Sequence, residues 1–95
     1  MNSPACPQCA GEALESVVAY GSLCARCAAC GANVVATSFL SLRASQAPVH
    51  AYLDPGHGQP PAADALVAKG PMHQVHSTIA KVAADGTSVR LIWEG

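Results

Sequence analysis

The sequence contains few charged side chains, few aromatic side chains and no long apolar run. Charged residues make up 12% of the 95 residues and aromatic residues 4%, whereas 51% are hydrophobic. High apolar content with low charge excludes an intrinsically disordered chain, and the lack of a run of about 18 apolar residues excludes a transmembrane helix. Nineteen of the hydrophobic residues are alanine, and an alanine side chain buries little area. A core of this size therefore needs an additional source of stability.

Basic residues are also scarce, and they do not cluster along the chain. The five are Arg26, Arg43, Lys69, Lys81 and Arg90. Against six acidic residues they give a formal net charge of −1. Because affinity for nucleic acid depends largely on neutralising phosphates, this balance argues against nucleic-acid binding; a membrane surface is disfavoured for the same reason. The first residues carry neither the basic stretch nor the apolar stretch of a secretion signal, so we expect a cytoplasmic protein.

Cysteine, by contrast, follows a definite pattern. Cys6 and Cys9 form one C-x2-C pair, Cys27 and Cys30 form a second, and 17 residues (10–26) separate them. Two cysteines three apart on a tight turn direct both thiolates at one point, and two such turns complete a tetrahedron around Zn²⁺. Gly31 permits the positive φ with which a chain leaves such a turn. We therefore predict one Zn²⁺ per chain, bound by Cys6, Cys9, Cys27 and Cys30.

This zinc site is predicted to be structural, and its alternatives are few. Four thiolates leave no open coordination position for water. Zinc binding, on the order of 10–16 kcal/mol, would supply the additional stability that the small core lacks. Cys24 is expected to be buried in a strand, because replacing Cys30 by it leaves only 14 residues (10–23) between the pairs. Iron fits the same four thiolates. Disulfides are disfavoured because five cysteines cannot all pair and the cytosol is reducing.

Two segments of the chain resemble known protein families. Residues 6 to about 40 resemble a zinc ribbon: CPQC, a β-prone run, a Gly-Ser turn, CAACG and a second β-prone run. The resemblance implies that the four knuckle cysteines bind zinc, but zinc ribbons occur in nucleic-acid binders, enzyme subunits and docking modules alike. Residues 64–93 show a fainter similarity to the last strand–helix–strand of ribosomal L7/L12-type C-terminal domains, which would imply a protein-binding unit with a strand over 65–69.

Four segments have the composition of strands. They are residues 13–20, 33–42, 49–53 and 88–94. In the last segment Val89, Leu91 and Trp93 share one face of a strand, and Arg90 and Glu94 share the other. We therefore expect the first face to meet the core and Arg90 to lie on a solvated face. Trp93 is alternatively an anchor for a partner, because tryptophan is enriched in binding hot spots.

Two helices are expected in the second half of the chain. Residues 61–69 begin with proline and precede Gly70, which is typical of a short helix, although 65–69 also fits a strand. Residues 71–84 are the clearer helix, because their apolar side chains recur at helical spacing. The resulting stripe consists of Met72, Val75, Ile79, Val82 and Ala83.

The histidines offer a second candidate site. His73 and His76 are three apart on the predicted helix, and with Asp54 or Asp64 they would provide ligands for a second metal. No established metal spacing such as H-E-x-x-H accompanies them, so packing of His76 against the apolar stripe is favoured. No nucleophile elbow, P-loop or dinucleotide motif is present, and we therefore predict a protein that is not an enzyme.

Together these patterns predict an α+β chain of two parts. Residues 1–42 form a zinc ribbon of short antiparallel strands, and residues 43–95 form a small helix–helix–strand unit. The predicted function is non-enzymatic protein–protein interaction, as a regulatory subunit or an inhibitor or immunity-type protein, with another protein or a second copy as the partner. The alternatives are a nucleic-acid-binding zinc ribbon and a metalloenzyme that uses a second metal at the histidines.

Overall fold

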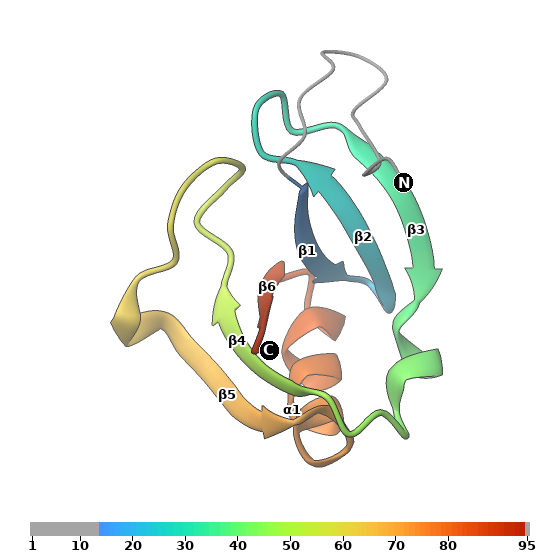
Figure 1. Ribbon diagram of the computed structural model, residues 1–95. Helices are drawn as coiled ribbons and strands as arrows, with labels where there is room; N and C mark the ends of the chain where they lie inside the picture. The colour runs from blue at the N-terminus through green and yellow to red at the C-terminus, as the bar shows by residue number, and fades with distance from the viewer. Residues whose placement is uncertain (1–13, 95) are drawn as a thin grey trace.

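Six antiparallel strands join into one sheet in the computed structural model, which describes residues 14–94 (Figure 1). The strands are β1 (Leu14–Ala19), β2 (Ser22–Cys27), β3 (Asn33–Ser38), β4 (Pro48–Leu53), β5 (Leu66–Pro71) and β6 (Val89–Trp93). Their spatial order is β3-β2-β1-β6-β4-β5. One helix, α1 (Met72–Ala84), packs against the sheet, and two short 3₁₀ turns are η1 (Phe39–Leu42) and η2 (Ala63–Ala65).

The front half forms a three-stranded meander. Ala19 pairs with Ser22, so only Tyr20 and Gly21 connect β1 to β2. Both have positive φ, 50° and 79°, which is the pattern of a type I′ turn that matches the twist of the flanking strands. Strands β2 and β3 then pair through a second hairpin, whose tip holds Cys27 and Cys30.

Strand β6 joins the strands from the first half of the chain to those from the second half. It pairs with β1 on one side, Val18 opposite Val89, and with β4 on the other, Ala51 opposite Leu91. The predicted boundary near residue 42 falls between η1 and β4, and strands from both sides of it share the sheet. No helix among residues 14–94 is long and apolar enough to cross a membrane.

The predicted fold class, with its helix–helix–strand unit, is wrong. The described chain is mostly β with the single helix α1, and residues 61–69 hold only the turn η2 and then strand β5. Pairing with β4 decides this conformation, because Val49 lies opposite Gly70 and Ala51 opposite Ala68. A nine-residue segment gains little as an isolated helix, whereas the strand completes backbone hydrogen bonds and packs Ala68 against the core.

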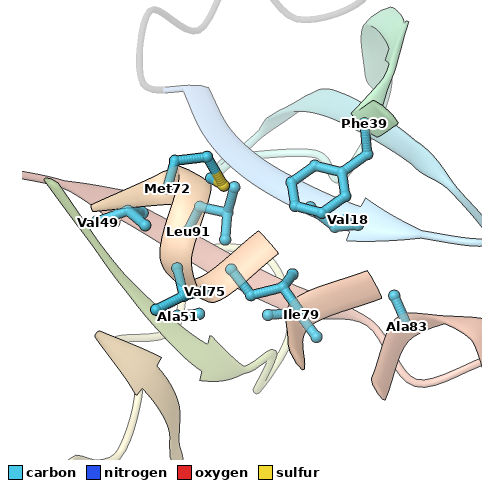
Figure 2. Close-up of a cluster of buried hydrophobic side chains, with 10 residues drawn as sticks. Val18, Phe39, Val49, Ala51, Met72, Val75, Ile79, Ala83 and Leu91 are labelled. Atoms are coloured by element: carbon cyan, nitrogen blue, oxygen red, sulfur yellow. The ribbon is translucent and has the colours of Figure 1, made fainter. Parts of the chain in front are cut away.

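The core lies between α1 and one face of the sheet (Figure 2). From the helix it takes four of the five predicted stripe residues, Met72, Val75, Ile79 and Ala83; Val82 is only partly buried. From the sheet it takes Val18, Val49, Ala51, Val89 and Leu91. These sheet residues alternate with others along each strand, so the pleat places them all on the face that α1 covers.

Strand β3 is shorter than predicted because its end turns into the core. The predicted strand over 33–42 stops at Ser38, and Phe39 begins η1. The Phe39 ring is buried and stacks on His76 of α1, with ring centroids 4.2 Å apart and planes 7° from parallel. His76 Nε2 donates to the Phe39 carbonyl at 2.8 Å, so this histidine is satisfied within the core.

Candidate metal centre and the adjoining ionic cluster

The second C-x2-C pair occupies the tip of the β2–β3 hairpin. Cys27 N–H donates to Ala32 O at 2.8 Å, and Gly31 N–H donates to Cys27 O at 2.9 Å, which closes the turn over residues 27–31. Gly31 has a φ of 80°, as predicted for the residue that leads the chain out of a knuckle. Cys27 is buried and Cys30 is exposed. The turn therefore fits half of a four-thiolate zinc site, for which Cys27 and Cys30 would supply two ligands.

The other two predicted ligands, Cys6 and Cys9, lie outside the described residues. Within residues 14–94, no group of three or more histidine, cysteine or acidic side chains is placed to hold a metal. Cys24 lies in the middle of β2, three residues before Cys27. An odd separation along a strand places two side chains on opposite faces of the sheet. The pleat thus separates Cys24 from Cys27, which favours the ligand set that omits Cys24.

The loop between β4 and β5 docks on the cysteine turn, as the proximity of the two segments in Figure 1 also shows. His57 Nδ1 lies 3.2 Å from Ala28 O, and because a carbonyl only accepts, Nδ1 must carry the proton. The approach requires glycine on both sides. A Cβ at Gly31 would lie 2.7 Å from the His57 ring, and a Cβ at Gly58 would lie 2.7 Å from Ala28 O.

An ionic cluster of two arginines and two carboxylates lies beside this loop. Arg26 donates to both oxygens of Asp54, Nη1 to Oδ2 at 2.7 Å and Nη2 to Oδ1 at 2.9 Å, and also to Glu15 Oε1 at 2.9 Å. Arg90 donates from Nη2 to Asp54 Oδ1 at 3.0 Å and to Gly56 O at 2.7 Å, and its Nη1 lies 3.2 Å from Glu15 Oε2. The four charges cancel, and each cation faces both anions.

The cluster is placed by the sheet on the face away from α1. Glu15 pairs with Arg26 across β1 and β2, and Arg90 of β6 lies opposite Val17 of β1. Only 6% of the Arg90 side chain and 6% of the Asp54 side chain are exposed. The expectation that Arg90 lies on a solvated face is therefore wrong, because the loop after Leu53 covers it.

Mutual hydrogen bonding sets the electrostatics of the cluster. The hydrogen bonds from Arg26 lower the pKa of Asp54 to about 2, with further support from the Gly56 N–H and from Arg90. The pKa of Arg26 is raised, chiefly by its hydrogen bonds to Asp54. The Asp54 carboxylate and the Arg26 guanidinium thus stay ionised across the physiological range.

This pKa shift predicts an acid-dependent loss of stability. Asp54 has a lower pKa folded (about 2) than its ordinary value of 3.8, so its contribution is complete above about pH 4 and is lost as pH falls towards 2. The contribution amounts to about 2 kcal/mol at neutral pH. We expect the gap in unfolding free energy between the natural chain and Asp54→Asn to narrow over this interval. A gap that stays constant from pH 5 to pH 2 would contradict the linkage.

The histidines do not assemble into a second site within the described residues. His76 is buried against Phe39, whereas His73, three residues earlier on α1, is exposed. The two predicted acidic partners are also unsuitable, since Asp54 is held by two arginines and Asp64 lies exposed in η2. The packed role of His76 that the sequence favours is confirmed.

Sequence reasoning missed the ionic cluster entirely. Its members come from β1, β2, β6 and the end of β4, and no local motif links Glu15, Arg26, Asp54 and Arg90. One signal was available: Asp54 precedes a Pro-Gly turn, where aspartate often bonds its own backbone, as its Oδ1 does with Gly56 N–H at 3.3 Å. That signal indicates a turn and does not identify the arginines.

Comparison of the chain with protein-family models, with curated proteins and with solved structures finds no match. The resemblance of residues 6 to about 40 to a zinc ribbon, and that of residues 64–93 to L7/L12-type domains, remain predictions.

Proposed function

We propose that this chain is a non-enzymatic, cytoplasmic protein-binding module. One structural Zn²⁺, bound by Cys6, Cys9, Cys27 and Cys30, would stabilise it. Its role would be that of a regulatory subunit or of an inhibitor or immunity-type protein. The observation that carries the proposal is an apolar patch with a polar rim on the sheet face that α1 leaves open. An apolar centre surrounded by polar groups is the usual composition of a protein interface.

This open-face patch consists of His50, Tyr52, Leu66 and Ile92. Val49 and Ala51 of β4 face the helix. His50 and Tyr52 alternate with them along the strand, so their side chains point to the sheet face that α1 leaves open. Register adds the other two members, since Ile92 lies opposite His50 and Leu66 lies opposite Tyr52.

The rim of the patch is polar and the centre is accessible. Ile92 is 41% exposed and Leu66 44% exposed. His50 Nε2 lies 3.3 Å from Glu94 Oε1, and Lys69 is opposite His50 on β5. Trp93 lies opposite Val49 and so points to the face that α1 covers, as predicted, but it retains 38% exposure at the end of β6 and contributes nothing to the patch.

The nucleic-acid alternative is weakened by where the cations lie. Two of the five, Arg26 and Arg90, are neutralised in the ionic cluster. Of the remaining three, Arg43 follows η1, Lys69 lies in β5 and Lys81 lies in α1. Three dispersed cations release few counterions from a phosphate backbone, so binding at physiological salt would be weak. The metalloenzyme alternative loses His76, which is engaged in the core.

A photo-cross-linking residue tests the proposed face directly. Placed at Ile92 of the zinc-loaded chain in its own cytoplasm, it should link one defined protein, whereas the same residue at Gln74, exposed on α1, should not. The linked protein, purified and titrated against the chain, should bind Ile92→Lys at least tenfold more weakly, because a charge would be desolvated at the interface (about 1.4 kcal/mol or more). Equal cross-linking from both positions would overturn the proposal, as would submicromolar nucleic-acid binding that weakens steeply with salt.

A further inference from the structure

The two edges of the sheet differ in how they are protected. The β5 edge carries a charged residue, Lys69, followed by Gly70 and Pro71. These are features with which natural sheets block edge-to-edge pairing. The β3 edge has the sequence Asn-Val-Val-Ala-Thr-Ser, with no charge and no proline, and five of its six residues are exposed.

The register of β3 identifies which backbone groups face the open edge. Phe39 N–H donates to Gly21 O at 3.0 Å, so Phe39 directs its N–H towards β2. Alternate residues of a strand direct their N–H and C=O groups to the same side, so Val35 and Thr37 also bond to β2. Ala36 therefore directs both its N–H and its C=O away from the sheet, and within residues 14–94 no strand lies on that side of β3.

Ser38 contributes a second outward group. It follows Ala36 by two residues and directs its N–H to the same open side. Its carbonyl is already engaged, because it accepts from Ser41 Oγ at 2.8 Å at the start of η1. The pairing capacity of the edge is thus centred on Ala36.

We propose that β3 pairs with β3 of a second copy of this chain, antiparallel, with the two-fold axis at Ala36. In this register Val35 of each copy lies opposite Thr37 of the partner subunit, which makes two cross-strand pairs of β-branched residues. The smallest chiral side chain lies at the axis, so the two strands approach without a clash. No like charges meet, as they would if a charged residue occupied a two-fold position.

The residues that flank the axis supply apolar surface to this interface. Val35 is 54% exposed, and Leu40, which follows β3 in η1, is also exposed. The contact is one strand wide, and pairings of this size are weaker than a standard interface, so we expect dissociation constants in the micromolar range. The proposal is independent of the open-face patch, whose members lie on β4, β5 and β6.

Sedimentation equilibrium of the full zinc-loaded chain tests the association. We expect a reversible monomer–dimer equilibrium, and we expect Ala36→Lys to raise the dimer dissociation constant at least tenfold, because two ammonium groups would meet at the axis. Ala84→Lys, an equivalent substitution at an exposed end of α1, should leave the constant unchanged. A chain that is monomeric at every concentration, or a dimer equally insensitive to both substitutions, would overturn the proposal.

Disulfide trapping tests the register. Residues opposite each other in a hydrogen-bonded antiparallel pair have Cα atoms about 5.5 Å apart, within disulfide range. In a Cys24→Ser background, Ala36→Cys should yield a covalent dimer with oxidised glutathione, whereas Thr37→Cys, opposite Val35, should not. Trapping at position 37 but not at 36 would refute the axis. Because Ile92→Lys should not alter either result, failure here remains distinguishable from failure of the proposed partner-binding face.

Discussion

Cys27→Ser should lose the proposed Zn²⁺ and fail to unfold cooperatively. Cys27 is fully buried at the end of β2, where it lies opposite Leu14 of β1, so the substitution removes a proposed metal ligand and places a hydroxyl in the same buried position. Structural zinc contributes on the order of 10–16 kcal/mol to folding, more than the total stability of a typical domain. Native mass spectrometry reports the metal, and thermal unfolding reports the cooperativity.

Cys24→Ser is the matched control for this experiment. The side chain lies in the same strand but on the opposite face of the sheet, so the variant should retain one metal per chain. The same spectrum distinguishes zinc from iron by mass. A natural chain that is folded without metal and contains two disulfides would contradict the zinc site.

Asp54→Ala should destabilise the fold by about 3–5 kcal/mol, the cost of leaving buried charges without their counterion. The substitution removes the carboxylate that receives hydrogen bonds from both Arg26 and Arg90. Glu15 alone would then face two cations whose side chains are 13% and 6% exposed. Chemical denaturation of the zinc-loaded chain measures the loss.

Asp64→Ala provides the comparison, because Asp64 is exposed in η2 and its removal should change the unfolding free energy by less than about 0.5 kcal/mol. Equal effects of the two substitutions would show that the cluster contributes nothing beyond a surface ion pair. The double variant Asp54→Ala/Arg90→Leu should recover part of the stability, since it removes one uncompensated cation together with its desolvation cost.

Local patterns identified the elements that depend on neighbouring residues alone. The stripe over 71–84 correctly predicted α1, and alternation over 88–94 correctly predicted β6. The helix favoured for 61–69 is wrong, and the strand left open as the alternative for 65–69 agrees with β5, which forms by pairing with β4. The expectation that Arg90 lies in solvent was also wrong, because alternation distinguishes two faces of a strand without showing whether the second face is covered.

The sequence by itself determined the spacing of the cysteines, the helical stripe and the residues with a preference for turns, because each depends on groups a few bonds apart. Only the tertiary structure decided that β6 lies between β1 and β4. That insertion brings Arg90 within hydrogen-bond distance of Asp54 and leaves β3 as an edge. The physical reason is that strand order follows from which apolar faces α1 can cover together, and this depends on residues distant along the chain.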